Sequence, residues 1–245
     1  MITAGIDLAA QPERTAVAII KWGAGRAVIE NVACRADDED ILQIVKLAGK
    51  TGIDCPFGWP TAFVSFVTDH HMGHVRLPAG PPGSRRDLTM RRTDAFVHEQ
   101  LHLTPLSVSA DRIAHVALRC AVLLAKLEDM GCPVDRSGSG PAAEVYPAAS
   151  LRSWGFTHHG YKQKTGAGAL DHLVDRLLGE APWLDCTTHE QTIRRSHDVF
   201  DAVIAAMTAR AAALVQTFAP VGDDLTAATA EGWIAIPSRP ISALP

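Results

Sequence analysis

The sequence reads Gly5-Ile6-Asp7-Leu8-Ala9 close to its start, a short apolar run interrupted by a single carboxylate. Buried strands of α/β sheets have this pattern. An acid at the carboxyl end of such a strand faces the crevice in which open α/β sheets bind their ligands. Asp7 is therefore a candidate functional residue. The alternative is an aspartate that caps a turn by accepting hydrogen bonds from nearby backbone N–H groups.

The next segments predict the sheet to which this strand belongs. Two further β-type runs, at 15–20 and 27–33, follow short polar or glycine-containing connectors, as in consecutive antiparallel strands. A helix is expected at 41–48, and then a fourth apolar run that ends at Asp54. If the first and fourth strands are parallel, Asp7 and Asp54 emerge at the same edge of the sheet.

Residues 61–105 are expected to form a long irregular insertion, and loops of that length are usually functional or mobile. The segment carries a basic cluster that includes Arg85, Arg86 and Arg92, and arginines at such positions suit contacts with phosphate groups. A solvated surface loop accounts for the same residues equally well.

The second half of the chain predicts three helices and one strand. Apolar periodicity indicates helices at 110–130, 168–178 and 196–218, and a short strand at 142–147 carries a third acid, Glu144. We expect residues 1–245 to form one domain, because 245 residues with 47% hydrophobic content can bury a full core.

Composition narrows the class of protein. The net charge of −4 differs from the basic balance of proteins that coat nucleic acid, so a nucleic-acid substrate would require a local basic patch. The five cysteines form no C-x-x-C pair, which favours reduced thiols over a disulfide framework or a zinc knuckle. The sequence lacks a leader pattern and any apolar run of the roughly 18 residues that a membrane helix needs. We therefore expect a cytoplasmic protein with no membrane partner.

Acidic residues also open the last predicted helix. Asp198 and Asp201 are three residues apart, which places them on one helix face. Together with Asp7, Asp54 and Glu144 they make a candidate catalytic group of five carboxylates. So many like charges would not all ionise within a few Å unless cations were bound. Mg²⁺ and Mn²⁺ are the natural occupants, and two such ions about 4 Å apart can catalyse phosphodiester hydrolysis.

Several short motifs follow one another in an order that is more specific than any one of them. They are Gly5-Ile6-Asp7-Leu8-Ala9, Ile53-Asp54-Cys55-Pro56-Phe57-Gly58, Arg92-Thr93-Asp94, Glu144-Val145-Tyr146-Pro147, Tyr161-Lys162, Asp198-Val199-Phe200-Asp201-Ala202 and Glu231-Gly232-Trp233-Ile234. Over nearly the whole chain, this order resembles domain-of-unknown-function family 429, whose members are regarded as predicted nucleases of the ribonuclease H-like fold.

This resemblance implies a fold, an activity and a set of site residues. The fold would be α/β, with a central mixed sheet whose first three strands are antiparallel and which is flanked by helices. The activity would be hydrolysis of nucleic-acid phosphodiester bonds with two Mg²⁺ or Mn²⁺ ions, nucleic acid being the partner. Asp7, Asp54, Asp198 and Asp201 match the metal-ligand positions of the wider superfamily, whereas Glu144 is an additional acid. Lys162 or Arg92 could neutralise the scissile phosphate.

Two other functions remain open at this point. An actin-like or sugar-kinase ATPase also begins with an acid after its first strand, but it normally has a duplicated domain and a second glycine-rich phosphate loop, neither of which is evident. A non-catalytic module could instead bind nucleic acid or protein through the arginine-rich segment. Such a module would bind without metal and would weaken when Arg85 and Arg86 are replaced.

Overall fold

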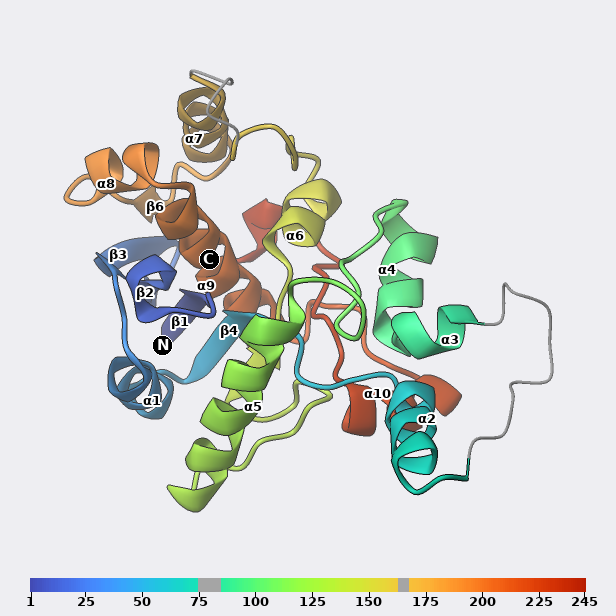
Figure 1. Cartoon of the computed structure of the whole chain (residues 1–245). Coiled ribbons are helices and arrows are strands. Elements are labelled where there is room, and N and C mark those ends of the chain that lie inside the picture. The colour runs from blue at the N-terminus through green and yellow to red at the C-terminus, as the bar shows by residue number, and fades with distance from the viewer. Residues whose placement is uncertain (75–84, 163–167) are drawn as a thin grey trace.

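The computed structural model describes residues 1–74, 85–162 and 168–245, and a mixed sheet lies at its centre (Figure 1). Within these ranges the strand order is β5-β4-β1-β2-β3-β6. The strands are β1 (Ile2–Asp7), β2 (Ala16–Gly23), β3 (Arg26–Cys34), β4 (Lys50–Asp54), β5 (Ala142–Glu144) and β6 (Leu184–Asp185). The expected α/β fold with a mixed sheet is therefore confirmed.

The pairing of the strands places two of the predicted acids together. Strands β1, β2 and β3 are consecutive and antiparallel, as their short connectors predicted. Strand β4 pairs with β1 in parallel, and the register aligns Asp7 with Asp54. Strand β5 pairs in parallel with β4 on one side of the sheet, and β6 pairs in parallel with β3 on the other side. The carboxyl ends of the first and fourth strands thus lie side by side and bring their carboxylates together, as predicted.

Helices cover both faces of the sheet. One face packs on α1 (Asp38–Leu47) and α5 (Ala114–Asp129). The other carries α9 (His197–Ala213), which lies across β1, β2 and β4, with α6 (Pro147–Ser153), α7 (Ala169–Glu180) and α8 (Glu190–Arg195) beside it. The helices predicted at 110–130, 168–178 and 196–218 are α5, α7 and α9, with ends shifted by up to five residues.

In the residues that the structure describes, the segment expected to be irregular is mostly helical. Its described part contains α2 (Thr61–His71), α3 (Arg86–Thr89) and α4 (Arg92–Leu101), and residues 75–84 lie outside the described ranges. With α10 (Asp223–Glu231) these helices form a group on the right of Figure 1. The prediction was wrong because proline and glycine are frequent in the sequence between α2 and α3 and because α3 is only four residues long. Contacts within the group, rather than an apolar stripe in the sequence, hold them: α2 buries none of its residues fully.

Two glycines allow α9 to lie directly on the sheet. Gly5 of β1 and Gly52 of β4 are neighbours in the register. A Cβ atom on Gly5 would lie 2.0 Å from the carbonyl oxygen of Ala202, and one on Gly52 would lie 2.5 Å from that of Ala205. Any larger side chain would push the helix away. This close approach brings the first turns of α9 to the edge at which β1 and β4 end.

Short 3₁₀ segments, Pro12–Arg14 and Ile241–Ala243, complete the described elements. None of the helices in the described ranges has both the length and the apolar character that crossing a membrane requires.

Candidate metal centre

Three aspartates converge where β1, β4 and α9 meet. Asp7 ends β1, Asp54 ends β4, and Asp201 lies in the second turn of α9. One carboxylate oxygen from each lies within 4.8 Å of the other two. Side chains alternate along a strand, so each strand aspartate projects on the same face as the glycine two residues before it, the face that α9 covers. We call Asp7, Asp54 and Asp201 the aspartate triad.

Burial and mutual repulsion both oppose ionisation of the triad. The pKa of Asp7 is raised well above its ordinary value, first by burial and then by the charges of Asp54 and Asp201. Burial raises the pKa of Asp54 to about 7 against the opposing effect of Lys162. Burial also raises the pKa of Asp201. An added positive charge would relieve this repulsion.

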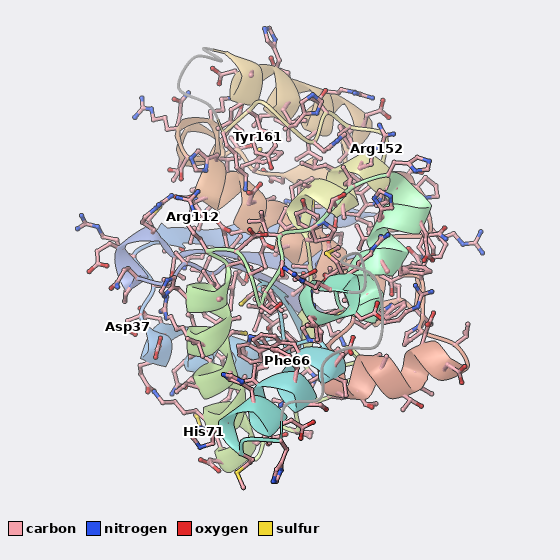
Figure 2. The ribbon with its side chains drawn as sticks, turned by 45° about the vertical axis from the view of Figure 1, so that its right-hand side comes forward. Asp37, Phe66, His71, Arg112, Arg152 and Tyr161 are labelled. Atoms are coloured by element: carbon pink, nitrogen blue, oxygen red, sulfur yellow. The ribbon has the colours of Figure 1, made fainter. Side chains whose placement is uncertain are left out.

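Two neighbouring residues fix the carboxylate of Asp201. The hydroxyl of Tyr161 donates a hydrogen bond of 2.7 Å to one oxygen, and the ammonium of Lys162 forms an ion pair with the other. Figure 2 labels Tyr161, which belongs to the segment between α6 and α7. The side chain of Lys162 is half-exposed. Burial lowers its pKa, but the nearby acids, Asp201 first, raise it by more. This one ammonium faces three carboxylates.

The triad has the donor chemistry of a site for a hard divalent cation. All three side chains offer oxygen, and Mg²⁺ and Mn²⁺ prefer oxygen ligands. The spacing lets one ion contact all three carboxylates. Burial is the first cause of the three raised pKa values, and repulsion among the acids adds to it at Asp7 and Asp54. The residues therefore fit such an ion.

Asp198, the other acid of this helix, lies at the margin of the triad. Its side chain is partly exposed, and one carboxylate oxygen lies 2.8 Å from Nδ1 of His197. Its charge contributes to the raised pKa of Asp7 less than the charges of the triad do. Of the two acids on α9, Asp201 is thus the one that the structure brings to β1 and β4.

Glu144 differs from its predicted role, because a buried arginine neutralises it. Arg91 donates hydrogen bonds of 2.7 and 2.9 Å to the two carboxylate oxygens of Glu144. The same guanidinium pairs with Asp94 at 2.8 Å, and all three side chains are at most 2% exposed. Glu144 also accepts a 2.9 Å hydrogen bond from the backbone N–H of Phe57, three residues after Asp54. Its oxygens are engaged, so we assign Glu144 a positioning role and not that of a metal ligand.

The predicted phosphate-binding arginines lie away from the triad. Arg92 pairs with Asp224 at 2.6 Å and with Glu99 at 3.0 Å, so its guanidinium is already occupied. Arg85 and Arg86 are exposed at the start of α3, and neither lines the cavity beside the triad. Among the predicted phosphate-binding residues, the structure brings Lys162 to the site and leaves these three elsewhere.

A cavity of about 480 Å³ opens beside Asp7 and Asp54. Its walls are largely apolar, with Leu8, Pro56, Leu106, Ile113, Val145 and Tyr146 in the lining. Its polar members include His158, His159 and Lys162, together with Arg91 and Glu144. Sequence reasoning overlooked the two histidines, Leu106 and the buried Arg91. The spacing of Arg91 and Asp94 at the start of a helix was an available signal, whereas nothing in the sequence connects the loop residues to this site.

Comparisons with known proteins give one finding. Searches of curated proteins and of solved structures return no significant match. A family model does match, over residues 5–224, which include every member of the triad and Glu144. The chain belongs to the family described as "Protein of unknown function (DUF429)".

Proposed function

We propose that the aspartate triad binds Mg²⁺ or Mn²⁺ and that the protein hydrolyses phosphodiester bonds of nucleic acid, on a ribonuclease H-like fold. The observation that carries this proposal is the convergence of three carboxylate oxygens within 4.8 Å. The sheet supports it: three antiparallel strands are followed by two strands parallel to the first, and adjacent strand ends supply two acids. A helix packed on those strands supplies the third.

Each residue has a definite task in this proposal. Asp7, Asp54 and Asp201 would hold the ion, and Tyr161 would keep Asp201 oriented through its hydroxyl. When bound, such an ion polarises a phosphoryl oxygen and lowers the pKa of a water. The half-exposed ammonium of Lys162 would offset negative charge on the phosphate in the transition state.

A second ion would need an additional ligand, and Asp198 is the acid placed to supply it. Its carboxylate is near enough to influence Asp7 but lies beside His197 in this structure. We therefore propose that the triad forms the tighter site and that a second ion, bound with Asp198, binds more weakly. Titration with Mn²⁺ tests this order: Asp198→Asn should remove only the weaker binding event.

The proposed activity is tested by cleavage of a panel of substrates in Mg²⁺ or Mn²⁺. The panel contains single- and double-stranded DNA, RNA, an RNA–DNA hybrid and a four-way junction, each also incubated with Asp7→Asn and with EDTA. We expect metal-dependent cleavage of at least one substrate and a loss of at least about a thousandfold in Asp7→Asn, because the variant lacks a charged ligand. Equal rates for the folded variant and the wild type would contradict the assignment.

A further inference from the structure

The cavity beside the triad has the dimensions of a site for a small ligand. Its volume of about 480 Å³ falls within the range in which proteins enclose small molecules. Segments far apart in the sequence form its walls: Leu8 and Pro56 follow the two strands that carry Asp7 and Asp54, and Leu106 and Ile113 precede α5. The acids therefore lie at the side of a partly open cavity that several segments of the chain build.

The cavity has an acidic region and a mainly apolar region. One part borders Asp7 and Asp54, where the proposed ion would bind a phosphate. The remainder is lined mainly by apolar side chains, and Tyr146 is half-buried there and contributes an aromatic ring. A phosphate bonded to a flat, largely apolar group matches both parts, because aromatic side chains stack on the faces of nucleobases.

Among the lining residues that the structure describes, the positive charge suits one phosphate and not a long backbone. Of the arginines and lysines among the described lining residues, Arg91 is buried and paired with two acids. This leaves Lys162, which is half-exposed and forms an ion pair with Asp201. His158 and His159 also line the cavity, and burial, followed by the charge of His159, lowers the pKa of His158. Proteins that follow a nucleic-acid duplex contact many phosphates with lysine and arginine.

We propose that this site accepts one nucleotide at a time: a phosphodiester of a single nucleoside, with the base in the apolar cavity and the phosphate at the triad. This inference rests on the proposed function and narrows its substrate. Two sources supply this chemistry, namely a small nucleotide ester and the free end of a single strand. On this inference, duplex interiors and strands without an end are poor substrates.

Matched leucine variants test whether the cavity holds the substrate. Leu106 lines the cavity and is 60% exposed, so Leu106→Trp should fill its mouth without disturbing the core. Leu118 on α5 is 59% exposed and is not part of the lining, so Leu118→Trp is the control. The substrates are thymidine 5′-(4-nitrophenyl phosphate), a linear single-stranded oligonucleotide, its circular form and a blunt duplex, all in Mn²⁺. Mn²⁺ affinity and the binding of thymidine 5′-monophosphate in Ca²⁺ are measured by calorimetry.

The inference predicts that wild type cleaves the small ester or the linear strand at least tenfold faster than the circular strand and the duplex. Leu106→Trp should lower kcat/KM at least tenfold and weaken thymidine 5′-monophosphate binding, with Mn²⁺ affinity unchanged, while Leu118→Trp behaves as wild type. If only the small ester is cleaved, the substrate is a free nucleotide ester. If the linear strand is cleaved, the substrate is the free end of a strand.

Two kinds of result would overturn the inference. The first kind leaves the proposed nuclease function standing, and the second kind overturns that function as well. Equal cleavage of the circular strand or duplex, or a Leu106→Trp variant with wild-type kinetics and nucleotide affinity, would overturn the one-nucleotide site while leaving the metal-dependent nuclease intact. Failure of the wild type to bind Mn²⁺, or to cleave any substrate once Mn²⁺ is bound, would overturn the proposed function and the inference together.

Discussion

Two groups of acids lie close together in this protein, one fully buried around Arg91 and one partly buried at the triad, and they differ in their partners. In the Arg91 cluster, Glu144 and Asp94 share a guanidinium that donates hydrogen bonds to both carboxylates. In the aspartate triad, three carboxylates face one half-exposed ammonium. Burial disfavours charge in both groups, but the Arg91 cluster satisfies its acids from within the protein. Burial of a carboxylate therefore does not by itself identify a metal ligand. The useful sign is a group of carboxylates with fewer positively charged partners than negative charges.

Removal of the guanidinium should have the largest effect on stability. Arg91→Met leaves Glu144 and Asp94 buried without their cationic partner, and breaking buried ion pairs in this way destabilises proteins by about 3–5 kcal/mol. Urea unfolding at pH 7 measures the change. A loss below about 1 kcal/mol would show that the Arg91 cluster does not anchor the fold.

A methyl group on the sheet should have the next largest effect. The new Cβ of Gly52→Ala would lie 2.5 Å from the carbonyl oxygen of Ala205, so α9 must shift, and overpacking of this kind destabilises proteins by about 1–3 kcal/mol. Because α9 carries Asp201, Mn²⁺ binding should weaken as well. Gly179→Ala is the matched control: Gly179 is exposed on α7 and its Cβ would meet open space. Unfolding curves and Mn²⁺ titrations that match for the two variants would contradict this account.

Removal of a triad charge should stabilise the metal-free protein. The pKa of Asp54 is about 7 in the folded state, above its unfolded value, so the folded state binds more protons between about pH 4 and pH 7. The stability of the wild type should therefore be highest at low pH in this window and fall as the pH rises through 7. Asp54→Asn should be more stable than the wild type at pH 8 by about 1 kcal/mol or more.

Mg²⁺ should reverse this advantage, because a bound ion offsets the charges in the wild type alone. Thermal unfolding at pH 5 and pH 8, with and without Mg²⁺, checks both statements. A variant less stable than the wild type at pH 8 without metal would show that Asp54 is already neutralised within the protein.

The smallest effect is expected on the surface. Arg92 is more than one-third exposed and pairs with exposed or partly exposed acids. Such pairs contribute about 0–1 kcal/mol, so Arg92→Ala should lose no more than that, and hydrolysis should be unchanged because its guanidinium does not line the cavity. A tenfold loss of activity would restore Arg92 to the phosphate-binding role that the sequence had suggested.

The sequence predicted the parts of the fold that depend on local pattern. Two apolar runs that each end in an aspartate indicated β1 and β4, and short connectors indicated the antiparallel strands between them. The tripeptide Gly-Ile-Asp occurs in both runs, at 5–7 and at 52–54. Its glycines were a readable signal for a close helix, and only the packing of α9 on them shows that Asp201, and not Asp198, completes the triad.

What the sequence could not supply depends on partners that are distant along the chain. Glu144 lies on a short apolar strand just as Asp54 does, so pattern alone assigned both the same role. The difference comes from Arg91, in a segment expected to be irregular, and from the backbone of Phe57. The walls of the cavity likewise combine residues from loops whose conformations are set by tertiary contacts.

Titration of Mn²⁺ into three proteins tests the central claim most directly, namely that the aspartate triad binds metal and the Arg91 cluster does not. Calorimetry would compare the wild type with Asp54→Asn and Glu144→Gln, with circular dichroism to confirm that each variant is folded. We predict that the wild type and Glu144→Gln bind Mn²⁺ with similar affinity and that Asp54→Asn loses the tight site. Wild-type affinity in Asp54→Asn, or equal losses in both folded variants, would contradict the account.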